Sequence, residues 1–143
     1  MTIAMILATK GHAVTTTPAA TRVGDVVRLL AGNRIGAVPV LGEDGRVRGI
    51  LSERDILYNL ASDGPAMLER RAEEVMTTPA ITVPSDLGVL VALSLMTRRR
   101  IRHLPVVDGG DLVGLVSLGD LVKARIDKVE AEAAAMREYI QST

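Results

Sequence analysis

The sequence GILSERD, at residues 49–55, returns as GLVSLGD at residues 114–120 with the same spacing. Each copy contains a glycine, two apolar residues, a serine and, three positions after the serine, an aspartate. A glycine at the end of a buried strand permits close approach of another backbone, and serine commonly opens a helix. The aspartate then lies one helical turn later on the same face. We therefore predict two equivalent junctions, each leading from a strand into a helix.

The two junctions are parts of a longer internal duplication. IGAVPVL at residues 35–41 matches IRHLPVV at residues 101–107. Further upstream, Pro18 and Pro84 each precede a segment with apolar residues at helical spacing. Each copy therefore reads as strand, helix, strand, strand, helix. The predicted fold class is α/β (α+β), built from tandem repeats of β-α-β-β-α type.

Local signals predict where the elements of each copy begin and end. Thr21 and Ser85 are the expected N-caps of the first helices, and Gly32-Asn33 is expected to end the first of these. The turn sequences GEDG at 42–45 and DGG at 108–110 separate β-branched runs, which indicates a hairpin in each copy.

The copies are expected to pack on each other. Neither copy alone carries enough apolar faces to enclose a core, so we predict one pseudo-symmetric body with its sheets facing each other. The groove between the copies is then the expected ligand site. The predicted organisation is a first segment and repeat at 1–62, a partly helical connection at 63–74, a second repeat at 75–126 and a helical tail at 127–143.

Composition excludes several classes of function. The 17 basic and 17 acidic side chains balance, so no overall positive field would attract nucleic acid or an anionic membrane. The absence of cysteine excludes disulfides, thiol catalysis and Cys-ligated metals. No apolar run is long enough to span a bilayer, and the segment Ile3 to Ala8 is too short for a signal-peptide core. We expect a cytoplasmic protein that does not bind membranes.

The Ser-x-x-Asp pair has two possible interpretations. It resembles a capping box, in which Ser52 with Asp55, or Ser117 with Asp120, satisfies the first turn of a helix. Alternatively, the carboxylate accepts the hydroxyls of a ribose while the helix N-terminus favours a phosphate. Two occurrences in register favour the ligand-binding interpretation.

Both copies resemble cystathionine-β-synthase-type (CBS) motifs. The resemblance covers about residues 10 to 125 and rests on the hydrophobic-Pro-Val strand, the hairpin and the Gly-x-x-Ser-x-x-Asp sequence, in that order. It implies a stand-alone CBS pair: a non-catalytic regulatory module that binds AMP, ADP, ATP or a related adenosyl ligand between its motifs. It also implies a homodimer and a regulated partner on another chain, and it requires no cofactor.

The resemblance also implies which residues bind the ligand, because each family pocket combines both motifs. One pocket would combine the ribose-binding Asp120 and its neighbours with the first strand segment, using Thr16, Ile35, Gly36, Ala37, Pro39, Ser117, Gly119 and Asp120. The other would use Ser52, Arg54, Asp55, Ile81, Thr82, Ile101, Arg102, His103 and Pro105. The second pocket has more positive charge for phosphates. Gly119 stands where some family members have a hydroxyl residue, which leaves the first pocket with fewer polar contacts.

Other candidate sites are weaker. The run Arg98-Arg99-Arg100 falls where a helix should finish, and cations are favoured there by the helix dipole. His12 and His103 lack neighbouring metal ligands, so no metal site is predicted. No nucleophile elbow, phosphate-binding loop or zinc-protease motif occurs, so we predict that the chain is not an enzyme.

The C-terminal tail carries a second signal. Its apolar residues alternate at spacings of four and three, as in a coiled-coil seam: Val122, Ile126, Val129, Ala133, Met136 and Ile140. The seam could pair with a second copy or lie on its own domain, and the length of the tail favours self-association. The remaining alternative for the whole chain is a structural or dimerisation module without a physiological ligand.

Overall fold

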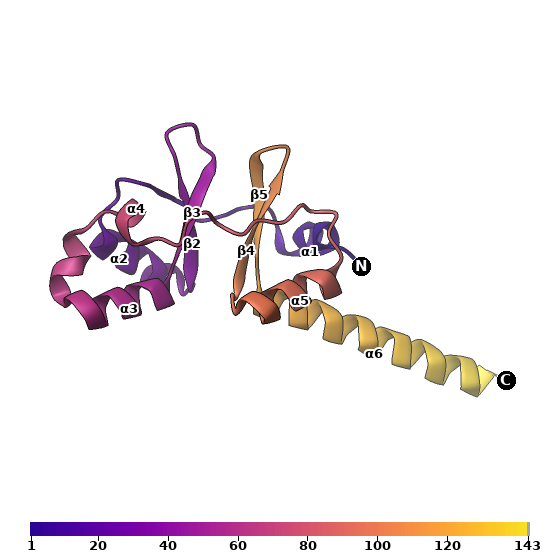
Figure 1. The fold of residues 1–143 in the computed structure, drawn as a ribbon. Coiled ribbons are helices and arrows are strands. Elements are labelled where there is room, and N and C mark those ends of the chain that lie inside the picture. Colours follow the sequence, from indigo (N-terminus) through magenta and orange to yellow (C-terminus); the bar gives the residue numbers. More distant parts are fainter. Residues whose placement is uncertain (143) are drawn as a thin grey trace.

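The computed structural model describes residues 1–142, in which two similar halves lie side by side (Figure 1). The first half consists of β1 (Thr17–Pro18), α2 (Val23–Asn33), β2 (Ala37–Leu41), β3 (Val47–Ser52) and α3 (Glu53–Asp63). The second consists of α5 (Val89–Arg99), β4 (His103–Asp108), β5 (Asp111–Ser117) and α6 (Leu118–Ser142). Three short helices precede or connect them: α1 (Ile3–Lys10), the 3-10 helix η1 (Pro65–Glu69) and α4 (Ala72–Val75).

Both predicted hairpins are confirmed. In each half the two long strands pair antiparallel, with Pro39 opposite Ile50 in the first half and Pro105 opposite Leu115 in the second. In the first half β1 extends the sheet by pairing parallel with β2. The corresponding position of the second half forms only a single parallel bridge, between Val83 and Val106. The duplicated fold is therefore complete in the first half and has a reduced first strand in the second.

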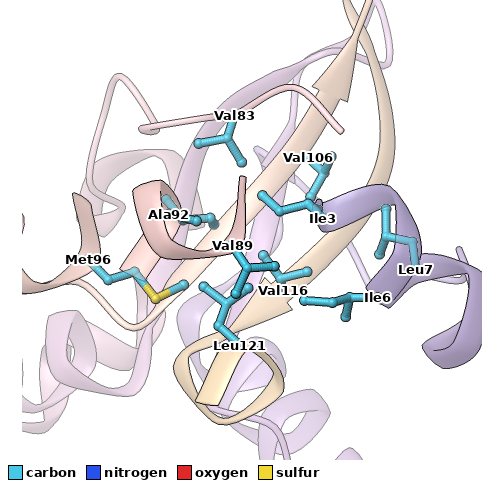
Figure 2. Close-up of a cluster of buried hydrophobic side chains, with 11 residues drawn as sticks. Ile3, Ile6, Leu7, Val83, Val89, Ala92, Met96, Val106, Val116 and Leu121 are labelled. Carbon is cyan, nitrogen blue, oxygen red and sulfur yellow. The ribbon is translucent and has the colours of Figure 1, made fainter. Parts of the chain in front are cut away.

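Each half has its own buried core, so the two copies do not enclose a common one. One buried cluster comprises Val23, Val26, Leu30, Val38, Val40, Leu51, Met67, Ala72 and Val75. The other comprises Ile3, Ile6, Leu7, Val83, Val89, Ala92, Met96, Leu104, Val106, Val116 and Leu121 (Figure 2). Each half closes its core with a short helical segment that the repeat itself does not contain.

These segments come from different parts of the chain. The first half is covered by the connecting segment, through Met67 of η1 and Ala72 and Val75 of α4. The second half is covered by α1, whose Ile3 and Leu7 are fully buried against β4 and β5 (Figure 2). The N-terminus of the chain thus packs in the half formed by the second repeat.

The predicted ends of the first helices need correction. Thr21 and Ser85 cap no helix: α2 begins after Arg22 and α5 after Gly88, and neither of these residues makes a side-chain cap. Ser85 instead donates its hydroxyl and its backbone N–H to the Asp108 carboxylate, at 2.6 and 2.9 Å. These two hydrogen bonds lower the pKa of Asp108. The serine therefore ties the segment before α5 to the hairpin turn.

α2 ends at Asn33, within the predicted Gly32-Asn33 stop. The residue in the left-handed conformation is Arg34, which follows the helix with φ 52°, and not the glycine. Arg100, the matching residue after α5, has φ 54°. As predicted, the arginine run closes α5, with Arg98 and Arg99 in its last turn. In each half, an arginine in an uncommon backbone conformation therefore connects the first long helix to the strand that follows it, β2 or β4.

The predicted helical tail is the continuation of α6, which extends away from the body for most of its 25 residues (Figure 1). Leu121 is its buried residue, and the side chains from Lys128 onward are partly or fully exposed. Thr143, the last residue of the predicted tail, lies outside the described residues. Among residues 1–142, no helix combines the length and apolar character needed to cross a membrane.

Candidate functional site

Both Ser-x-x-Asp pairs form the hydrogen bonds of a capping box. At the start of α3, the backbone N–H of Ser52 donates to Asp55 Oδ2 at 2.9 Å, and the N–H of Asp55 donates to Ser52 Oγ at 3.2 Å. At the start of α6 the equivalent distances between Ser117 and Asp120 are 2.8 and 3.1 Å. The capping interpretation is confirmed at both junctions. It leaves acceptor positions on each carboxylate, so it is compatible with ligand binding.

Each aspartate also receives a hydrogen bond from a residue that lies outside its own motif. The hydroxyl of Thr77 donates to Asp55 Oδ1 at 2.9 Å. The ammonium of Lys10 donates to Asp120 Oδ2 at 2.6 Å. Burial raises the pKa of Asp120, but the hydrogen bonds from Lys10 and Ser117 and the charge of Lys10 outweigh burial and lower it overall.

Asp55 lies in a cleft between the two halves, which we call the Asp55 cleft and which has a volume of about 200 Å³. The first half contributes Gly36, Ile50, Ser52, Glu53, Arg54 and Asp55. Thr77, which pairs with Ile50 of β3, lies on the same side, and the facing wall consists of Ile81, Arg100, Ile101, Arg102 and His103. The cleft therefore places a carboxylate, aliphatic side chains and several cations around one space.

A larger hollow of about 690 Å³ adjoins this cleft, and we call it the central hollow. Its lining from the first half is Val27, Leu30, Ala31, Arg34, Ile35, Gly36, Glu53 and Ile56. From the second half it takes Arg102, His103, Ser117, Leu118 and Gly119. Gly36, Glu53, Arg102 and His103 line both spaces. A ligand in the Asp55 cleft could thus extend into the central hollow.

The two halves lie close to each other at Gly36 and His103. A Cβ atom at position 36 would lie 3.2 Å from His103 Cε1 and 3.4 Å from Glu53 Oε1, so a larger residue would push the ring or the carboxylate away. Burial lowers the pKa of the His103 imidazole, and the Glu53 carboxylate only partly opposes this effect. A neutral imidazole is therefore favoured at the boundary between the halves.

Cations surround this boundary, but one of them is already engaged. The Arg54 guanidinium donates to the backbone carbonyl of Arg100 at 3.0 Å, which links α3 to the end of α5. Arg102 is exposed beside it and lines both spaces. Arg102 is thus the better placed of the two for a phosphate, whereas Arg54 also connects the halves.

The structure brings together most of the residues predicted for the second pocket. Seven of them line the Asp55 cleft: Ser52, Arg54, Asp55, Ile81, Ile101, Arg102 and His103. Thr82 is exposed outside this lining, and Pro105 is buried within β4. Pro105 is therefore buried inside the second half and does not line the cleft.

The residues predicted for the first pocket are more dispersed. Ile35, Gly36, Ser117 and Gly119 line the central hollow. Ala37 and Pro39 are buried in β2, Thr16 precedes β1, and Asp120 lies beside Lys10. None of these last four lines either described space. The two aspartates, equivalent in sequence, therefore have different surroundings.

Sequence reasoning missed Glu53, Thr77, Arg100 and Lys10. Glu53 stands inside the repeated motif, between the serine and the aspartate, so its place at the start of α3 could have been noticed. Thr77 and Lys10 lie outside the two Gly-x-x-Ser-x-x-Asp motifs, and only the folded chain brings them to the carboxylates. No pattern in the sequence pointed to either contact.

The arrangement has the groups needed to hold a ligand. Among the described residues, no group of three or more histidines, aspartates or glutamates is placed to hold a metal ion. The serines of the two junctions donate or accept within their capping boxes, and His103 is not among their hydrogen-bond partners. Carboxylates with free acceptor positions, aliphatic walls and nearby cations are suited to recognising a polar ligand with an apolar ring and a negative group.

Comparison with known proteins gives the same picture of two repeats. The family model "CBS domain" matches residues 7–62 and 72–127. The CBS domain-containing protein CBSX3, mitochondrial, from Arabidopsis thaliana is 35% identical over 121 residues, which cover 82% of this chain. The matched part spans 59% of the length of CBSX3.

Solved structures share the whole arrangement. The CBS-domain containing protein ATU1752 from Agrobacterium tumefaciens superposes with a TM-score of 0.84 at 35% identity, covering 87% of this chain and 92% of that one. The CBS domain pair of protein MJ0100 superposes with a TM-score of 0.79 at 26% identity, covering 90% and 98%. That structure is a complex with 5′-methylthioadenosine and S-adenosyl-L-methionine.

Proposed function

This chain belongs to the CBS domain family, and from that premise we propose that it is a non-catalytic regulatory module that binds an adenosine-containing ligand in the Asp55 cleft. CBS domain pairs are regulatory modules, and the pair of MJ0100 is known in complex with two adenosyl compounds. The observation that carries the proposal is the position of the Asp55 carboxylate in a space walled by both halves.

The chemistry of the Asp55 cleft matches the parts of a nucleotide. The Asp55 carboxylate is an acceptor for the ribose hydroxyls: Oδ2 accepts from the N–H and hydroxyl of Ser52, whereas Oδ1 accepts only from Thr77 and keeps a second lone pair for the ligand. Ile81 and Ile101 supply an apolar clamp for the purine. The two tyrosines of the chain lie outside the cleft lining, so the clamp is aliphatic.

The phosphates of AMP, ADP or ATP would extend toward the central hollow. Arg102 and His103 line both spaces, and Arg54 lies at the start of α3. Guanidinium groups bind phosphate oxygens through charge-assisted hydrogen bonds. The net charge of the chain is zero, so this local group of cations is what would favour an anionic ligand over a neutral one.

Regulation requires that ligand binding favour one arrangement of the halves. The Asp55 cleft takes one wall from each half, and the Arg54 to Arg100 hydrogen bond crosses the same boundary. A ligand that contacts both walls binds best at one angle between the halves and therefore stabilises that angle. We propose that this change is transmitted to a partner protein carried on another chain.

Calorimetric titration tests the proposal. The protein is first freed of bound nucleotide and then titrated with AMP, ATP, S-adenosylmethionine and 5′-methylthioadenosine. Saturable binding of at least one compound is the expected result, with ATP preferred over the uncharged 5′-methylthioadenosine if the arginines contact phosphate. No binding of any of them would support the alternative, a structural module whose serine and aspartate pairs serve only as helix caps.

We also propose that α6 mediates self-association with a second copy. Its apolar seam continues past the body, where Val129 and Met136 are exposed. A helix that extends into water without a partner is marginally stable, whereas pairing of two such seams buries both. In a parallel pair, Arg125 would face Glu130 of the other copy, and Glu132 would face Arg137.

Light scattering tests this proposal. The double variant Val129→Glu/Met136→Glu is expected to halve the molar mass of the wild-type oligomer, because it places charges in the seam. The matched control Ala131→Glu/Ala134→Glu changes the outward side of the same helix and should keep the wild-type mass. An unaltered mass for the seam variant would refute a role of the tail in self-association.

A further inference from the structure

The two aspartates are held by chemically different partners at equivalent places in the fold. Thr77 follows α4 and donates a neutral hydroxyl to Asp55 at 2.9 Å. Lys10 ends α1 and donates a charged ammonium to Asp120 at 2.6 Å. In each half the donor comes from the segment whose helix closes that half's core. The pseudo-symmetry of the repeats is therefore broken by one positive charge.

Lys10 is fixed in this position by its own contacts and by its helix. Its ammonium also donates to the backbone carbonyl of Leu115 at 2.8 Å, so it is held to the end of β5 as well as to Asp120. The preceding turn of α1 is anchored by Leu7, which is fully buried in the core of the second half. After the helix, His12 lies 2.9 Å from the carbonyl of Val113 through its Nδ1 atom. The whole segment thus lies along β5.

The charge on Lys10 changes what Asp120 can offer to a ligand. The ammonium adds a charge–charge attraction to the Asp120 carboxylate, which no neutral donor can supply. Both Lys10 and the backbone N–H of Ser117 donate to the same oxygen, Oδ2. A ribose at Asp120 would therefore have to compete with an ion pair, whereas a ribose at Asp55 competes only with uncharged donors, the Thr77 hydroxyl and the N–H and hydroxyl of Ser52.

We propose that Lys10 is an internal counter-ion that occupies Asp120 and makes this the weaker of two adenosine sites. This inference rests on the proposed function, because it assigns an order of filling to the two aspartates. The ligand enters the Asp55 cleft first. The Asp120 site, consisting of Ser117, Asp120 and Lys10, fills only when the ligand displaces the lysine.

Titration of Lys10→Met with 5′-methylthioadenosine tests the proposal. Methionine is close to lysine in length but has neither its charge nor its donors. The uncharged probe avoids any direct contact between Lys10 and a phosphate. Because a partly exposed ion pair contributes modestly, we expect binding at the second site to strengthen by about two- to fivefold. Lys10 and Asp120 are 38% and 26% exposed, which places the pair in this range.

Two further variants assign the effect. Lys128→Met removes a lysine from α6 eight residues beyond Asp120, outside the lining of both described spaces, and should leave both affinities unchanged. Adding Asp120→Asn to Lys10→Met should abolish the strengthened binding and leave the first site intact. Thermal unfolding of each variant confirms that it is folded, and Lys10→Gln serves as a second neutral variant at this position.

The outcomes separate this inference from the proposed function. If wild type and all variants fail to bind 5′-methylthioadenosine, AMP or ATP, the proposed function itself is wrong. If wild type binds but Lys10→Met leaves the second site unchanged or weaker, only the role of Lys10 is refuted. A loss of ATP affinity in Lys10→Met, with no gain for the uncharged probe, would show that the lysine binds phosphate and would also overturn the inference.

Discussion

Replacing Leu7 with alanine is expected to lower the free energy of unfolding by about 2–5 kcal/mol, the range for a large-to-small change in a closed core. Leu7 is fully buried between α1 and the hairpin of the second half (Figure 2). Its side chain fills the space above Gly114, where a Cβ atom would lie 2.7 Å from Leu7 Cδ2. The cavity left by alanine therefore has few neighbours that can close it. Chemical denaturation followed by circular dichroism measures the loss.

The matched control for this prediction lies on the same helix. Met5 is 61% exposed on α1, and Met5→Ala should change the free energy of unfolding by less than about 0.5 kcal/mol. If Leu7→Ala were as stable as Met5→Ala, α1 would not be part of the core of the second half. The position of Lys10 beside Asp120 would then lose its anchor.

Asp55→Asn is expected to weaken binding of AMP or 5′-methylthioadenosine at the first site by about 10- to 100-fold. Asparagine keeps the size of the side chain but removes the charge that strengthens hydrogen bonds from the ribose hydroxyls. Hydrogen bonds to charged groups contribute about 1.5–3 kcal/mol each, which sets this range. Calorimetry of the purified variant measures the change in dissociation constant.

Asp55 also caps α3, so stability must be separated from affinity. The control is Asp25→Asn, which removes a carboxylate from the first turn of α2, outside the lining of both described spaces. Both variants should lose some stability, because both lose a negative charge near a helix N-terminus. Only the Asp55 variant should lose affinity. Equal affinities in wild type and Asp55→Asn, with the protein folded, would refute the assignment of the ribose to this carboxylate.

Much of the fold could be predicted because the sequence contains an internal duplication. A motif that recurs in register reports a repeated structure even where each copy is ambiguous, and both hairpins and both strand-to-helix junctions follow from it. Helix ends were less predictable, since they depend on distant partners. Serine is a common N-cap, but Ser85 instead donates its hydrogen bonds to the Asp108 carboxylate beside the hairpin turn.

The candidate site was predictable to the extent that it lies within the repeats. The resemblance to CBS motifs implied one pocket for Asp55, Ile81 and Ile101, and they line one cleft. The sequence could not show which residues outside the two Gly-x-x-Ser-x-x-Asp motifs contact their aspartates. The contact between Lys10 and Asp120 joins residues 110 positions apart, and it depends on α1 packing into the second half and not the first.

The central claim is that an adenosine ligand enters the cleft between the halves, and isoleucine methyl spectra locate it most directly. Ile81 and Ile101 line the Asp55 cleft, whereas Ile3 and Ile6 are on the buried face of α1, in the core of the second half. On titration with 5′-methylthioadenosine, the δ-methyl signals of Ile81 and Ile101 should shift to saturation while those of Ile3 and Ile6 stay in place. Unchanged signals from Ile81 and Ile101 at saturating ligand would contradict the account.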